Sequence, residues 1–269
     1  MNVTDVSPIQ IDQPGYVLAI ECLFVLGALV SFFRVSTYVV QQARQGTLID
    51  SPRSPLVFPV PPAIGWTFAI GILALVLSQS PLAVLYYVLV PAGIGVFLAA
   101  ERRSAEYQFG LSRIGSFHLV RWMLVVCAAF FFVEIPLSNV IDRGMTWLQL
   151  AHPPQQTVVM FQQIQRPDLM VLFILSAILI VPFTEELFFR GFVYSFLKRF
   201  MPTWGAIMLS AAVFAVAHAN LGSVLQLWLL GVVLATAYEH SGSLLLPMGI
   251  HGCFNFVTAI SLLIEKSTS

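Results

Sequence analysis

The feature that most constrains this chain is a series of apolar stretches long enough, or nearly long enough, to cross a lipid bilayer. A spanning helix needs about 20 mainly apolar residues, because the hydrocarbon core is about 30 Å thick. Backbone polar groups in hydrocarbon need partners within the chain, so each span is expected to be a helix. We predict an all-α, polytopic integral membrane protein with about eight transmembrane helices, at 16–40, 63–77, 82–100, 117–138, 169–199, 203–219, 223–238 and 244–264. The second span is short, which leaves seven as the alternative number.

The composition supports a membrane protein. Of the 269 residues, 58% are hydrophobic and only 10% are charged, whereas a soluble domain carries about 25% charged residues. This apolar composition indicates the lipid bilayer as a partner. The net charge is zero, which gives no sign of a nucleic-acid partner. Cys22, Cys127 and Cys253 lie in apolar segments, and we interpret them as small buried side chains, not as a disulfide framework or a thiolate metal site.

The chain is predicted to form a single membrane domain over 1–269. N-terminal helices occupy 16–138, and an interfacial or lid-like connector outside the membrane follows at 139–168. The region 169–264 carries the motifs described below. The first 15 residues hold Asp5 and Asp12 and no Lys or Arg, the reverse of a secretory signal.

The loop charges predict an orientation. Lys and Arg accumulate on the cytoplasmic side of membrane proteins. With eight spans, seven such residues fall on one side and three on the other, namely Arg44, Arg53, Arg102, Arg103, Arg113, Lys198 and Arg199 against Arg143, Arg166 and Lys266. We therefore expect a multi-pass protein of a prokaryotic cytoplasmic membrane, with both termini outside.

Several ionisable side chains lie at membrane depth, where a charge costs about 2.5–3.5 kcal/mol on insertion scales and usually marks function. Glu21, Arg34 and Glu134 are isolated, and we expect structural or peripheral roles for them. A second group is clustered on three spans, and its members are Glu185, Glu186, Arg190, His218, His251 and Asn255. This cluster is the candidate site.

Helical spacing predicts how the cluster is arranged. Glu186 and Arg190 are four residues apart with the acid first, the favourable order for an ion pair on one helix face. Glu185 is rotated by about 100° from Glu186, so both cannot face Arg190 equally well. His218 lies about 22 Å along its span from Thr203, and an antiparallel hairpin then places it level with Glu185. His251 lies at the same level if this hairpin extends roughly 10 Å further into the cytoplasm than the start of the span that carries His251.

The segments "EELFFRG", "FAVAH" and "HGCFN" resemble, in order and type, the motifs E-E-x-x-x-R, F-x-x-x-H and H-x-x-x-N of the CAAX protease and bacteriocin-processing family. The resemblance covers about 182–256. It implies a multi-helix intramembrane glutamic endopeptidase without a cofactor. Its substrates would be membrane-associated peptides or lipidated proteins, of prenylated CAAX type or bacteriocin type.

The resemblance also implies roles for the cluster. Glu185 would activate water with His218, and His251 with Asn255 would hold the oxyanion. The residue types agree, because peptide hydrolysis needs a base, a water and oxyanion donors. Glu186 and Arg190 are interpreted as a supporting pair.

Two alternatives remain open from the residues. Zinc could be bound by one glutamate, His218 and His251, since zinc takes such ligands plus water. This would make the chain a zinc metalloprotease. In the other alternative the chain is a non-proteolytic transporter or scaffold, in which the cluster acts as a proton relay or ligand site.

Overall fold

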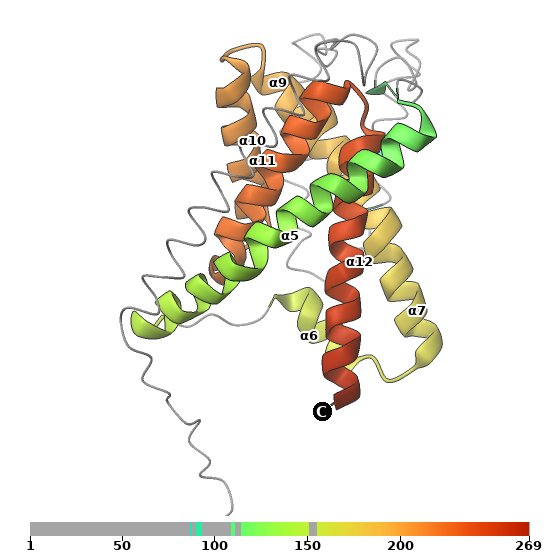
Figure 1. Cartoon of the computed structure of the whole chain (residues 1–269), viewed down its shortest axis with the longest axis vertical. Helices are drawn as coiled ribbons and strands as arrows, with labels where there is room; N and C mark the ends of the chain where they lie inside the picture. The colour runs from blue at the N-terminus through green and yellow to red at the C-terminus, as the bar shows by residue number, and fades with distance from the viewer. Residues whose placement is uncertain (1–86, 88–89, 93–108, 111–113, 151–154, 269) are drawn as a thin grey trace, which may run out of the picture.

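The computed structural model describes residues 87, 90–92, 109–110, 114–150 and 155–268. All regular structure in these ranges is helical, with no strand (Figure 1). Within these ranges, four helices are long and apolar enough to cross a membrane. The first two predicted spans and most of the third lie outside the described residues, so a total of eight stays a prediction.

Helix α5, Ser116–Trp147, corresponds to the fourth predicted span but is longer than expected. The prediction that this helix ends at Ser138 was wrong, because the helix continues through the first part of the presumed connector. Pro136 lies inside it without ending it. In Figure 1, α5 runs diagonally across α11 and α12, and it packs against both helices.

In the described remainder of the connector, a short helix, α6, covers Gln156–Gln163. It lies beside the C-terminal end of α12 (Figure 1). There the Lys266 ammonium donates to the carbonyl oxygens of Gln162 and Ile164, at 2.9 and 2.6 Å. These bonds fasten the connector to the last helix.

The fifth predicted span is one continuous helical path, Pro167–Leu197. It consists of α7 (Pro167–Leu175), a π-helical turn η1 (Ser176–Ile180), α8 (Val181–Glu186), a second π-helical segment η2 (Leu187–Tyr194) and α9 (Ser195–Leu197). Pro182 explains the first π turn. It has no N–H to donate to the carbonyl four residues earlier, and the Val181 N–H donates to Ser176 O, five residues back. Such π turns are rare and are often found at functional sites.

Helices α10 (Thr203–Ala217) and α11 (Val224–Ser241) form an antiparallel hairpin. Gly231 makes their close packing possible, because a Cβ atom there would lie 2.9 Å from Ala211 Cα. The turn contains the short 3₁₀ helix η3 (Leu221–Ser223), and the Asn220 side chain accepts a bond from Ser223 N–H. With 15 residues, α10 is too short to be one of the four candidate spans.

Helix α12, Leu245–Thr268, runs to the C-terminal end of the chain, which is marked in Figure 1. It packs on α5, α11 and the long helical path. Gly252 allows its close approach to η1, since a Cβ atom there would lie 2.7 Å from the carbonyl oxygen of Ile178. The Cys127 thiol of α5 donates to Ile250 O of α12 at 3.4 Å, and Cys127 is buried as predicted.

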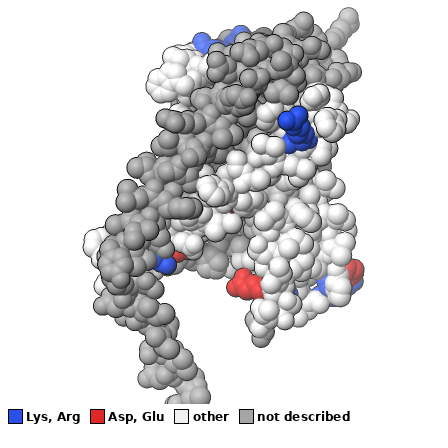
Figure 2. All heavy atoms as spheres, in the orientation of Figure 1, with Lys and Arg blue, Asp and Glu red and all other residues white. Residues whose placement is uncertain are grey.

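The described surface suits a lipid environment. Exposed large apolar side chains occur on α5, α7, α10 and α12. In the face seen in Figure 2, the described surface is mostly uncharged, and the few charged groups lie mainly toward its two ends. Together with the apolar helices, this confirms an integral membrane protein. The side of the membrane on which each terminus lies stays a prediction.

Candidate active site

The structure brings five of the six predicted residues into direct contact or near contact. Glu185 and Glu186 end α8, and Arg190 follows in η2. His218 is the C-terminal cap of α10, and His251 lies two turns into α12. The helix lengths predicted that Glu185 and His218 lie at the same depth, and the 3.9 Å distance between their side chains confirms this.

The predicted Glu186–Arg190 pair forms and is completely buried. Arg190 Nη1 donates to Glu186 Oε1 at 2.7 Å, and the two side chains are 1% and 0% exposed. Arg190 Nη2 also donates to the carbonyl oxygen of Gly231 on α11, at 3.1 Å. Its guanidinium carbon lies 4.7 Å from the centre of the Phe214 ring, a favourable cation–π geometry. The pair therefore joins the long helical path to both helices of the hairpin.

Sequence reasoning missed a further partner of Glu186. His251 Nδ1 lies 3.0 Å from Glu186 Oε1, the same oxygen that accepts from Arg190. An ionised carboxylate can only accept, so this bond requires a proton on His251 Nδ1. Glu186 thus orients His251 as well as neutralising Arg190. The residues are 65 positions apart in sequence, and no local spacing could have indicated the contact.

Glu185 points to the two histidines and not to Arg190, as its rotation predicted. Its Oε2 atom lies 3.9 Å from His218 Nε2 and 3.8 Å from His251 Nε2. Both distances exceed those of direct hydrogen bonds. Oε2 is buried and has no hydrogen-bond partner among the described residues. A buried carboxylate oxygen without a partner is costly in a purely structural position, so the arrangement favours a role in binding or chemistry.

Phe214 holds both histidines in place. Its carbonyl oxygen lies 2.8 Å from His218 Nδ1, four residues later. Its ring makes edge contacts with the rings of His218 and His251, with centres 4.7 and 5.8 Å apart. The side chain is fully buried. Phe214 and His218 are four residues apart and therefore lie on one helix face, but the contact with His251 depends on tertiary packing.

Asn255 is one turn from His251 on α12, and its amide is already engaged. Nδ2 donates to the carbonyl oxygen of Ala177 in η1 at 2.7 Å. An amide nitrogen carries two protons, so at most one N–H remains for a substrate. The structure therefore gives Asn255 a helix-to-helix contact that the sequence did not indicate.

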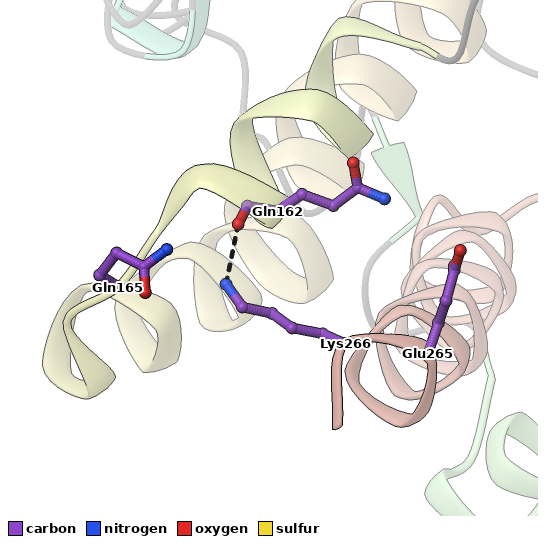
Figure 3. A pocket seen from close by; sticks show the side chains of 4 residues that line it. All are labelled: Gln162, Gln165, Glu265 and Lys266. Atoms are coloured by element: carbon purple, nitrogen blue, oxygen red, sulfur yellow. Dashed lines mark hydrogen bonds between the residues drawn. The ribbon is translucent and has the colours of Figure 1, made fainter. Parts of the chain in front are cut away.

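Among the described residues, no group of three or more His, Cys, Asp or Glu side chains is arranged to hold a metal ion. A pocket between α6 and the end of α12 is lined by Gln162, Gln165, Glu265 and Lys266 (Figure 3). It contains none of the predicted site residues. Glu134 on α5 is half-buried, while Glu21 and Arg34 lie outside the described residues.

The described residues thus form an all-helical membrane protein with a Glu–His–His cluster, in which the His218 side chain is 25% exposed. A buried Glu–Arg pair supports this cluster. The family model described as type II CAAX prenyl endopeptidase Rce1-like matches residues 167–257. That match confirms the predicted resemblance to the CAAX protease family over this segment, which carries all six site residues.

One curated relative is similar over part of its length. It is described as an uncharacterized 24.3 kDa protein of Escherichia coli and is 33% identical over 90 residues. The aligned part is 32% of this chain and spans 41% of the length of that relative. No solved structure matches the chain.

Proposed function

We propose that the chain is an intramembrane endopeptidase that uses Glu185 and His218 to activate water. The observation that carries the proposal is the position of Glu185 Oε2, buried and unpaired, near Nε2 of both His218 and His251. The family match over 167–257 supports the class of reaction. The same geometry gives each side chain a separate task.

His218 is suited to accept a hydrogen bond from the attacking water. Its Nδ1 lies 2.8 Å from a backbone carbonyl oxygen, which can only accept, so the proton of the neutral ring is on Nδ1. Nε2 is then an acceptor that faces the Glu185 carboxylate. A water molecule between them can donate one hydrogen bond to each, since the 3.9 Å separation is too long for direct contact. This arrangement polarises the water for attack.

His251 is suited to stabilise negative charge on the substrate. Its Nδ1 proton is held by Glu186, so Nε2 can donate only when the ring is an imidazolium. We propose that His251 Nε2–H donates to the oxyanion as it develops. The second N–H of Asn255 is the remaining predicted donor.

The proposed reaction balances with these groups alone. Glu185 takes a proton from water, and the oxygen attacks the peptide carbonyl carbon. The carbonyl π electrons move to the oxygen, which His251 stabilises. When the oxyanion collapses, the C–N bond breaks and protonated Glu185 gives its proton to the leaving amine. Glu185 is thereby returned to its ionised form.

The proposed substrates are membrane-associated peptides or lipidated proteins, of prenylated CAAX type or bacteriocin type. The mostly uncharged outer surface supports substrates presented from the bilayer. The test compares new N-termini in a membrane-protein pool incubated with the chain or with its Glu185→Ala variant. Glu265→Gln, on an exposed carboxylate, is the matched control and should cleave like the original chain. Cleavage that persists in Glu185→Ala would refute the proposed base.

A further inference from the structure

We infer that Asn255 is a positioning residue, which satisfies the Ala177 carbonyl in the π turn η1 and thereby fixes the direction of Glu185. The contact itself is independent of the proposed function, whereas its catalytic consequence rests on that function. The reason lies in the backbone of the long helical path, where a carbonyl group loses its usual partner.

Two neighbouring features remove the local partners of Ala177 O. In a regular α-helix this oxygen would accept from the Val181 N–H, but that N–H donates to Ser176 O instead. The next position along the chain, 182, is proline and has no N–H. Ala177 lies in a helical path that is long and apolar enough to cross a membrane, and a carbonyl group without a partner is unfavourable in that setting. The turn therefore needs a donor from elsewhere in the protein.

Helix α12 supplies this donor at close range. Asn255 Nδ2 donates to Ala177 O at 2.7 Å. One turn earlier, Gly252 has no side chain to separate α12 from the next carbonyl, Ile178 O, which a Cβ atom would approach to 2.7 Å. The carbonyl groups of Ala177 and Ile178 thus face α12, where Asn255 donates to the first and Gly252 leaves space for the second. The close approach at Gly252 and the hydrogen bond from Asn255 are two independent observations that α12 packs closely on η1.

The π turn determines which way the following residues point. It includes one more residue than an α turn, and each residue turns the chain by about 100°. If η1 became a regular α turn, Glu185 would rotate by about that angle relative to α7. Its carboxylate would then turn away from His218 and His251. By holding Ala177 O in the π turn, Asn255 acts on the direction of Glu185.

The first measurement is a double-mutant cycle on thermal unfolding in detergent. Asn255→Ala is made in the original chain and in the Pro182→Ala background, where the new N–H can serve the turn. The melting temperature should fall clearly in the original chain and much less in the Pro182→Ala background. The control is Thr258→Ala, whose hydroxyl bonds only within α12, to Phe254 O at 3.0 Å. It should have the same small effect in both backgrounds. Equal losses for Asn255→Ala in the two backgrounds would overturn the inference.

The second measurement separates positioning from direct donation to the oxyanion. The probe is a farnesylated, internally quenched peptide with a CAAX-type end. Asn255→Ala should lower kcat about tenfold or more at unchanged KM, and this loss should shrink in the Pro182→Ala background. An equal kcat loss in both backgrounds, with the melting temperature unmoved, would assign Asn255 to the oxyanion and reject positioning.

A second background protects the test against a poorly folded Pro182→Ala chain. Gly252→Ala moves α12 away from Ile178 O and weakens the Asn255 contact, so Asn255→Ala should cost less there as well. An undiminished cost in this background would contradict the inference. If the original chain does not cleave the peptide or any membrane protein, the proposed function fails. The double-mutant cycle on the melting temperature still tests whether Asn255 satisfies the Ala177 carbonyl.

Discussion

The buried Glu186–Arg190 pair allows a sharp test of the site. Glu186→Gln keeps the size and the accepting oxygen but removes the charge that neutralises Arg190. Both side chains are buried, at 0% and 1% exposure, and deleting one partner of a buried pair costs roughly 3–5 kcal/mol. We expect that loss in the free energy of unfolding in mixed detergent micelles. Turnover should also fall, because Glu186→Gln removes the carboxylate that orients the His251 ring through its Nδ1.

Arg190→Met in the same chain should recover much of the lost stability, since removing both members of a buried pair is often nearly neutral. Activity should remain low in this double variant. The matched control is Asp168→Asn in the exposed pair with Arg166, whose side chains are 58% and 70% exposed; solvent screens that pair, so stability should hardly change. A loss below about 1 kcal/mol for Glu186→Gln, the range of exposed pairs, would refute the reasoning. Purely additive effects of the two substitutions would do the same.

Three further predictions concern chemistry and orientation. Glu185→Gln should abolish turnover while leaving unfolding nearly unchanged, and a variant that still cleaves would move the base elsewhere. Purified active protein should hydrolyse its substrate without stoichiometric zinc, as elemental analysis and chelator treatment would check; activity lost to a chelator and restored by zinc would show a metalloprotease. Thr268→Cys, after replacement of the native cysteines by serine, should react in intact cells with an impermeant thiol reagent. Protection of that site would invert the predicted orientation.

Local helical geometry made part of the site predictable. The four-residue spacing of Glu186 and Arg190 placed them on one face, and the pair is present. The rotation of Glu185 away from that face was also predictable, as was its level relative to His218. These features depend on rise and rotation per residue, which hardly vary between helices. The family motifs then identified the same side chains by their order in the chain.

Contacts between segments distant in the sequence could not be predicted from local helical geometry. The bond from His251 to Glu186 and the bond from Arg190 to the Gly231 carbonyl depend on how three helices pack. The end of α5 was misplaced because polar residues after Ser138 remain compatible with a helix that continues beyond the apolar stretch. Pro182 was a visible signal of a helix irregularity. Its consequence, a free carbonyl satisfied by Asn255, needed the position of α12.

The shortness of α10 has a consequence for the surrounding lipid. Its 15 residues extend about 22 Å, less than the hydrocarbon thickness of about 30 Å, and His218 closes its end. This hydrophobic mismatch is met by local thinning of the bilayer or by polar groups that reach toward the interface. Either response brings the aqueous phase closer to the end of α10 than a full-length span would. The helix that presents His218 would thus give water a shorter path into the membrane than a full-length span gives.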